Sequence, residues 1–210
     1  MWYLCGRSTR ISIRSSFFLI YINDISDNLI SLCRLFADDT SFGYSETNAD
    51  VIKQTISHDL SELSNWSKLW LMSFNPNKTE IMVFSNCDIH DDFIFTLDDQ
   101  NIPIVKKHKH LGITLSDDAK WNDHVDSLLQ SISKHVSVLR KLQYKINRNN
   151  LEKLYLVYIR PLFEYGCEIW DNCGVIYTEK LEKLQREALR IITGLPYYCS
   201  NERLYSETCI

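Results

Sequence analysis

The sequence predicts an α+β protein in which a mixed portion precedes an all-helical portion. Short apolar segments recur between residues 30 and 115, one long amphipathic helix interrupts them, and the amphipathic segments after residue 121 have a helical period. The chain has 210 residues, of which 45% are apolar and 24% charged. This composition is typical of a folded globular protein and excludes collagen-like and disordered classes.

The N-terminal region divides at about residue 16. Residues 8–16 have no clear period, whereas residues 17–22 are strongly apolar and predict either a buried helix or a buried strand. The longest apolar runs have six residues, far fewer than the ~20 that a membrane helix needs. We therefore expect no membrane partner.

A hairpin and a long helix follow. Residues 30–37 and 40–44 predict two strands joined by a turn at Asp38-Asp39, because aspartate favours turns. Residues 47–72 predict a helix that Thr47 caps. Its apolar stripe repeats every three or four residues and comprises Ile52, Ile56, Leu60, Leu63, Trp66 and Trp70.

Short strands complete the mixed portion. A turn at Asn75-Pro76-Asn77 precedes a strand over residues 80–85. Residues 93–97 and 102–105 predict a hairpin, and residues 110–115 predict one further strand.

The second portion predicts helices only. Apolar residues recur at helical spacing over residues 121–142, 151–159 and 178–192. The last of these helices is expected to end at Gly194 and Pro196.

Charge and cysteine content bear on location and partners. The net charge is −4, yet residues 106–160 carry 11 basic and 5 acidic side chains. Such a basic stretch indicates either a nucleic-acid footprint or a solvated helix face. The seven cysteines include no C-x-x-C pair, so we expect reduced thiols in a cytoplasmic or nuclear compartment.

The adjacent carboxylates Asp38 and Asp39 are the most informative feature. Two carboxylates at a tight turn repel each other unless a cation neutralises them. Mg²⁺ is the natural partner, since it binds one or two carboxylates and leaves room for substrate phosphates. The alternative is an ordinary Asp-Asp turn without chemistry.

The context of this turn resembles a known family. Residues 18–25, followed closely by Phe36-Ala37-Asp38-Asp39, resemble the palm of reverse transcriptases, specifically those of non-LTR retrotransposons of the jockey and CR1 type. Later segments resemble the same family in the same order: Trp66, Trp70, and residues 75–80, 108–115, 121–124, 139–142 and 159–166.

The resemblance implies a fold and an activity. Residues 17–117 would form a partial palm, a short antiparallel sheet with a packed helix, and residues 118–210 an all-helical thumb and connection. The activity would be RNA-directed DNA polymerisation, in which two metal ions support nucleotidyl transfer from a dNTP on an RNA template and a DNA primer. Asp38 and Asp39 would bind Mg²⁺ or Mn²⁺, and Lys78 would lie near the triphosphate.

The resemblance also gives the basic block a role. Its residues would contact template–primer phosphates, which position a nucleic acid without reading its sequence. The residues concerned are Lys106, Lys107, Lys109, Arg140, Lys141, Lys145 and Arg148.

Departures from the family pattern argue against activity of this chain by itself. An upstream palm aspartate and the fingers are expected outside it, relatives usually continue beyond Ile210, and no Pro-Gln-Gly loop precedes residue 17. A one-base shift of plausible codons restores that loop, so we hypothesise that residues 1–16 are degenerate and translated out of frame. The alternative function is a non-catalytic retrotransposon remnant, a helical module that binds nucleic acid or another protein.

Overall fold

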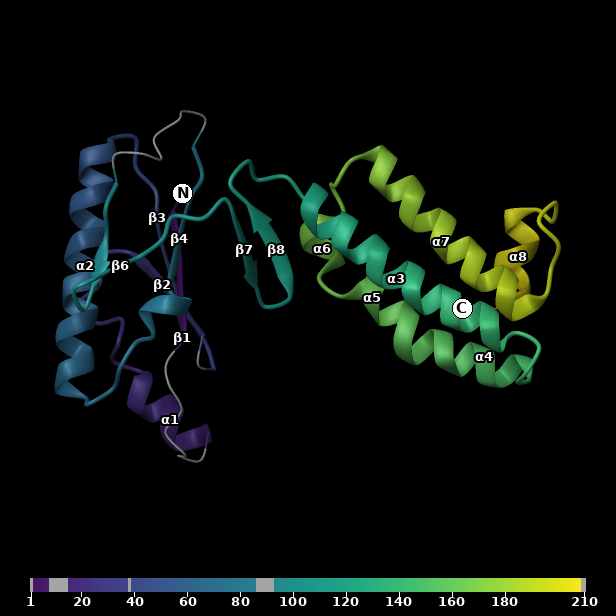
Figure 1. Cartoon of the computed structure of the whole chain (residues 1–210), viewed down its shortest axis with the longest axis horizontal. Coiled ribbons are helices and arrows are strands. Elements are labelled where there is room, and N and C mark those ends of the chain that lie inside the picture. The colour runs from purple at the N-terminus through teal and green to yellow at the C-terminus, as the bar shows by residue number, and fades with distance from the viewer. Residues whose placement is uncertain (1, 8–14, 38, 86–92, 209–210) are drawn as a thin grey trace. The chain divides into compact units, whose positions relative to one another are not determined.

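The structure is a computed structural model that describes residues 2–7, 15–37, 39–85 and 93–208. It contains two compact units, Met1–Ala119 and Lys120–Ile210. The first combines helices with small antiparallel sheets and the second is helical, which confirms the α+β class (Figure 1). Each unit is described by itself.

The first unit is built on a four-stranded antiparallel sheet with the order β2-β3-β1-β4. Its strands are β1 (Trp2–Arg7), β2 (Leu32–Phe36), β3 (Asp39–Tyr44) and β4 (Glu80–Val83). The predicted β2–β3 hairpin is confirmed. Strand β1 was not expected, since no element was predicted for residues 2–7. Backbone pairing with β3 on one side and β4 on the other defines this strand.

Two helices accompany the sheet. Helix α1 (Ser15–Ile22) decides the ambiguous apolar run in favour of a helix. Helix α2 (Ala49–Leu69) is capped by Asn48, whose side chain accepts the N–H of Asp50 at 2.9 Å. The expected cap at Thr47 was wrong by one residue, because the Thr47 hydroxyl bonds Glu46 instead.

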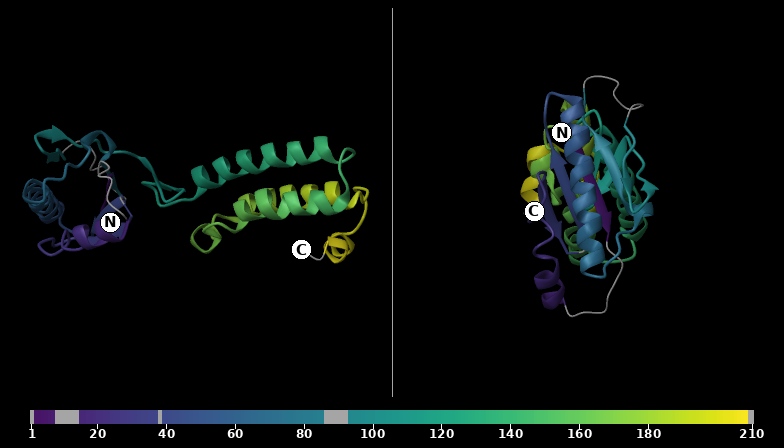
Figure 2. Two further views of the ribbon diagram at one scale, coloured as in Figure 1. Left: turned by 90° about the horizontal axis from the view of Figure 1, so that it is seen from below. Right: turned by 90° about the vertical axis from the view of Figure 1, so that its left-hand side faces the viewer.

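Helix α2 lies along one face of the sheet (Figures 1 and 2). The predicted stripe is buried from Ile52 to Leu63, while Trp66 packs at its margin. The stripe shares one core with apolar side chains of β3 and β4, among them Phe42, Ile81 and Val83.

An aromatic cluster joins the end of α1 and the residues just after it to the end of α2. The indole N–H of Trp66 donates to Asp24 at 2.9 Å. The ring of Tyr21 lies edge-on to Trp70, 4.9 Å between centroids, and its hydroxyl donates to the Trp70 carbonyl. These contacts attach residues 21–24, part of the stretch that carries the family resemblance, to the helix that follows the hairpin.

The connecting elements of the first unit are short. They are the 3-10 turn η1 (Pro76–Lys78), the hairpin β5 (Thr96–Leu97) with β6 (Gln100–Asn101), and the hairpin β7 (Lys107–His110) with β8 (Ile113–Ser116). The single strand expected over residues 110–115 was wrong. The chain reverses at Leu111 and Gly112, whose φ values are 46° and 85°, so His110 pairs with Ile113.

The second unit consists of helices in short succession. They are α3 (Asn122–Leu142), α4 (Arg148–Leu154), the π-helical segment η3 (Tyr155–Ile159), α5 (Arg160–Glu164), α6 (Cys167–Trp170), α7 (Val175–Thr193) and α8 (Asn201–Thr208). Helix α7 ends at Gly194 as predicted, in the left-handed conformation with φ 71°.

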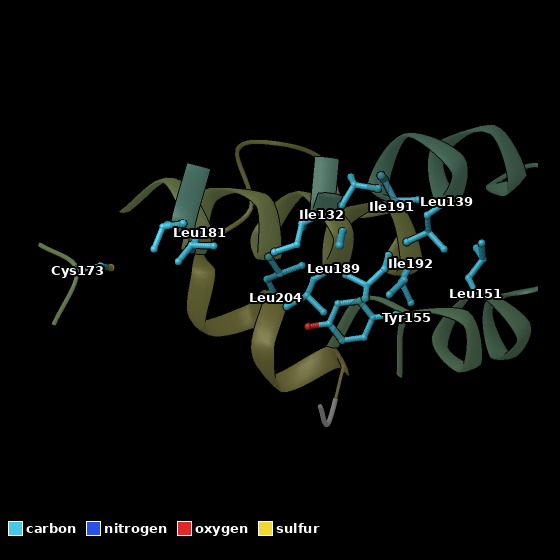
Figure 3. Packing of buried hydrophobic residues seen from close by; sticks show 14 of the residues in the cluster. Ile132, Leu139, Leu151, Tyr155, Cys173, Leu181, Leu189, Ile191, Ile192 and Leu204 are labelled. Atoms are coloured by element: carbon cyan, nitrogen blue, oxygen red, sulfur yellow. The ribbon is translucent and has the colours of Figure 1, made fainter. Parts of the chain in front are cut away.

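Helices α3 and α7 run side by side in the same direction (Figure 1), with Tyr177 bonded to Asp126 and, further along, Arg140 paired with Glu187. Buried side chains of both helices meet Tyr155 from η3, which is 1% exposed (Figure 3). The buried residues that α3 and α7 contribute to this hydrophobic core include Val125, Ile132, Val136, Leu139, Ala188, Leu189 and Ile192.

Two sequence expectations concern the whole chain. Within the part that the structure describes, no helix is both long and apolar enough to cross a membrane. Cys33, Cys167, Cys173 and Cys199 are free thiols.

Candidate functional site

One of the two candidate carboxylates, Asp39, lies where the turn after β2 leads into β3. Phe36 pairs with Asp39 across the hairpin, so the connection between the two strands is short. Ala37 has φ 53°, the left-handed value that tight hairpin turns require and that non-glycine residues adopt at a cost. Asp39 is the first residue of β3 and half-buried. Asp38 lies outside the described residues, so the structure places one of the two predicted metal ligands.

Strand β4 begins at the same end of the sheet as β3. Arg7 of β1 opposes Asp39 on one side, and Cys5 of β1 opposes Glu80 on the other. Asp39 and Glu80 therefore begin two strands that flank β1 at one end of the sheet. The sequence interpretation assigned no role to Glu80.

Lys78 reaches this end because of the turn that precedes β4. The side chain of Asn75 accepts the N–H of Asn77 at 3.1 Å and so begins η1, and Pro76 occupies its first position. Thr79 is 1% exposed and anchors the end of the turn, whereas Lys78 is exposed. The fold thus brings Lys78 to the sheet end that also carries Asp39.

Strand β7 lies against the start of β4. The Nδ1–H of His108 donates to Glu80 Oε2 at 2.7 Å, and the His108 side chain is 11% exposed. Burial is the main reason that the pKa of His110 lies below its ordinary value. The electrostatic influence of the neighbouring His108 lowers the pKa of His110 further, and the negative charge of Asp39 opposes this lowering. The charge of Asp39 therefore acts on a side chain of β7.

Alternation along β7 separates histidines from lysines. His108 and His110 are half-buried on one side of the strand, while Lys107 and Lys109 are exposed, as is the preceding Lys106. The predicted lysines thus form an exposed basic edge beside the end of the sheet that holds Asp39. The basic composition of residues 106–160 marked these lysines in the sequence, but the contact between His108 and Glu80 had no sequence signal.

Metal-ligating side chains do not assemble further in the described part of the chain. No group of three or more histidine, cysteine, aspartate or glutamate side chains is arranged there to hold a metal ion. Asp38, the second predicted metal ligand, lies outside the described residues.

The remaining predicted nucleic-acid contacts belong to the second unit. Arg140 forms an ion pair with Glu187, and the Arg148 Nε donates to Glu152 at 2.8 Å. Both charges are therefore compensated locally. Lys141 and Lys145 are exposed at the end of α3 and just after it.

Comparisons with known proteins confirm the resemblance stated above. Over 195 residues, 87% of this chain, the sequence is 25% identical to a probable RNA-directed DNA polymerase from transposon BS of Drosophila melanogaster. Over 181 residues, 84% of the chain, it is 22% identical to a probable RNA-directed DNA polymerase from transposon X-element of the same fly.

The chain spans about a fifth of the length of these curated relatives, 21% and 20% respectively. No family model and no solved structure matches the chain.

Proposed function

We propose that this chain is part of an RNA-directed DNA polymerase of a non-LTR retrotransposon of the jockey and CR1 type. In this proposal residues 17–117 belong to the palm, and residues 118–210 to the thumb and connection. The similarity to two transposon polymerases over most of the chain carries the proposal. The tight hairpin that starts β3 with Asp39 supports it, because it places the Asp39 carboxylate at the end of a sheet.

The carboxylates of Asp38 and Asp39 would hold Mg²⁺ or Mn²⁺. Carboxylate oxygens are the donors that these hard cations prefer, and Asp39 offers its oxygens from a half-buried strand end. When bound, the ions would neutralise charge on the reacting phosphates.

Other residues of the first unit would position the substrates. The protonated amine of Lys78, exposed at the same sheet end, would attract the triphosphate of an incoming dNTP. Lys106, Lys107 and Lys109 would contact phosphates of the RNA template and DNA primer, since their side chains line the exposed edge of the β7 segment. Arg140, Lys141, Lys145 and Arg148 would add phosphate contacts from the second unit.

Metal binding tests the central claim. We would titrate the chain with Mn²⁺ and follow free Mn²⁺ by electron paramagnetic resonance. The double variant D38N/D39N should lose binding that the parent chain has, because neutral amides attract a divalent ion less strongly than carboxylates. Unchanged Mn²⁺ binding in this variant would contradict the proposed site.

The chain offers a matched control for this experiment. Asp98 and Asp99 form a second Asp-Asp pair at a two-residue hairpin turn, with φ values of 49° and 62°. The variant D98N/D99N removes the same charge from another hairpin of the first unit and should bind Mn²⁺ like the parent chain. Equal losses in both variants would indicate a general electrostatic effect.

Catalysis needs a separate assay. A transposon BS polymerase that carries this segment in place of its own should extend a DNA primer on an RNA template, and D38N/D39N should abolish extension. Nucleic-acid binding without extension would favour the alternative, a non-catalytic binding module.

A further inference from the structure

A basic cavity opens in the second unit. Of the residues assigned a role above, Arg140 alone lines it. The cavity has a volume of about 780 Å³, and it is lined by α3, α7 and the segment that leads into α8. Four lining side chains are cationic and one, Glu187, is acidic. The cavity therefore has the charge of an anion site.

Two of the four cationic side chains already form ion pairs with glutamates. Arg140 pairs with Glu187, and Arg186 Nη1 donates to Glu182 at 2.8 Å. Lys183 is exposed at the cavity wall, and none of the described carboxylates forms an ion pair with it or with Arg190. Lys183 and Arg190 thus supply positive charge that is available to a ligand.

Arg190 gives a second, independent indication of a ligand. Its Nε is buried and has no hydrogen-bond acceptor among the described residues, and its Nη2 makes only a long contact of 3.4 Å with Asn201. A buried guanidinium donor without an acceptor is unfavourable. An anionic oxygen in the cavity would provide the missing acceptor in a charge-assisted hydrogen bond.

An aromatic ring stands beside this guanidinium. The Arg190 Cζ lies 5.1 Å from the centroid of the Tyr197 ring, a cation–π arrangement that holds both groups. Tyr197 nevertheless remains 84% exposed. Much of its ring is therefore accessible to a planar partner, next to the unmatched cations.

We infer that this cavity binds single-stranded nucleic acid, with a backbone phosphate between Lys183 and Arg190 and a base stacked on Tyr197. An unmatched cation next to an exposed aromatic ring is the combination by which proteins hold single strands without reading their sequence. The inference rests on the proposed function only in taking nucleic acid as the ligand class. It requires neither a metal ion nor Asp38 and Asp39.

Fluorescence anisotropy of the full chain with a labelled 12-nucleotide single-stranded RNA, in EDTA, tests this site. Lys183→Gln and Arg190→Gln should each weaken binding roughly tenfold and flatten its salt dependence, since each loses a phosphate contact. Lys180→Gln is the matched control, because Lys180 lies on the same helix, one turn away, over the Tyr177 ring. It should change affinity less than twofold.

The stacking claim has its own variants. Tyr197→Ala should weaken binding roughly five- to tenfold, whereas Tyr197→Phe should retain it, because stacking uses the ring and not the hydroxyl. Tyr198→Ala removes a neighbouring ring that is 91% exposed and does not line the cavity, and should have no effect.

Cys199 reports where the strand binds. Cys199 lines the cavity, whereas Cys167 does not, and both side chains are half-buried. Bound RNA should slow maleimide labelling of Cys199 but not of Cys167.

Three results would overturn the inference. The first is an equal loss of RNA affinity in Lys183→Gln and Lys180→Gln. The second is that RNA slows the labelling of Cys199 and Cys167 equally. The third is complete displacement of the RNA by millimolar inorganic phosphate, which would indicate a simple anion site. Because EDTA is present, unchanged RNA binding by D38N/D39N would support this site even if the proposed metal site failed.

Discussion

The buried carboxylate of Asp59 accepts the backbone N–H of Ser31 at 2.9 Å, and so joins the middle of α2 to the residue that precedes β2. Its other oxygen accepts the N–H of Ile30 at 3.0 Å. Asp59 is 3% exposed, so these charge-assisted bonds form away from water. The helix thereby sets where the strand of the candidate hairpin begins.

We expect Asp59→Ala to destabilise the first unit by about 2–3 kcal/mol, because the buried N–H of Ser31 would lose its acceptor. Hydrogen exchange read by mass spectrometry should show peptides over residues 32–44 exchanging roughly 30- to 150-fold faster. Asp27→Ala removes the same charge from an exposed position and should leave exchange unchanged. Equal rates in both variants would contradict the role of Asp59.

Burial raises the pKa of the Cys33 thiol to about 11, although the neighbouring Arg34 charge works in the opposite direction. Only the thiolate is nucleophilic, so at pH 8 we expect Cys33 to react with iodoacetamide about a hundredfold more slowly than a thiol of ordinary pKa. The rate should rise as pH increases toward 11. Labelling followed by peptide mass spectrometry measures this rate, with the chain unfolded in urea as the reference.

Ile132 is fully buried between α3 and its neighbours. Ile132→Ala should leave a cavity and lower the free energy of unfolding of the second unit by about 3 kcal/mol. Val138→Ala on the same helix, where the side chain is 56% exposed, should cost less than about 1 kcal/mol. Hydrogen exchange of α3 and α7 peptides distinguishes the two, and comparable effects would argue against this core.

Gly194 ends α7 with φ 71°, and a Cβ there would meet no atom within 4 Å. The effect of substitution is therefore conformational and not steric. Gly194→Ala should cost about 1 kcal/mol, and Gly194→Asn less, because asparagine tolerates the left-handed region. Thermal unfolding followed by circular dichroism should rank the midpoints Gly, Asn, Ala, and a reversed order would refute this explanation.

The sequence predicted the helices and strands that form because of their own residue pattern. Helices α2, α3 and α7 follow from apolar stripes, and the β2–β3 hairpin from two apolar segments around a turn. The helix expected over residues 151–159 divides into α4 and η3. Nothing in the period of the sequence marks the change to a π-helical turn at Tyr155.

Elements that depend on distant partners were not predicted. Strand β1 exists because β3 and β4 pair with it, and no element was predicted for residues 2–7. At the candidate site, adjacency and composition predicted Asp39 and the lysines. The pairing of His108 with Glu80 and the arrangement of Arg190 with Tyr197 need tertiary contacts that no spacing reveals.

The central place of β1 has a consequence for how the chain folds. Leu4 opposes Phe42 on one side and Ile81 on the other, so the sheet joins segments far apart in the chain. Pairing strands that are far apart in the chain slows folding, because a long loop must close first. Bundles of consecutive helices form quickly by comparison. During synthesis, the hairpin of β2 and β3 can form early, but the sheet is completed only after β4 has left the ribosome. We therefore expect the first unit to reach its native state more slowly than the second, although its synthesis finishes earlier.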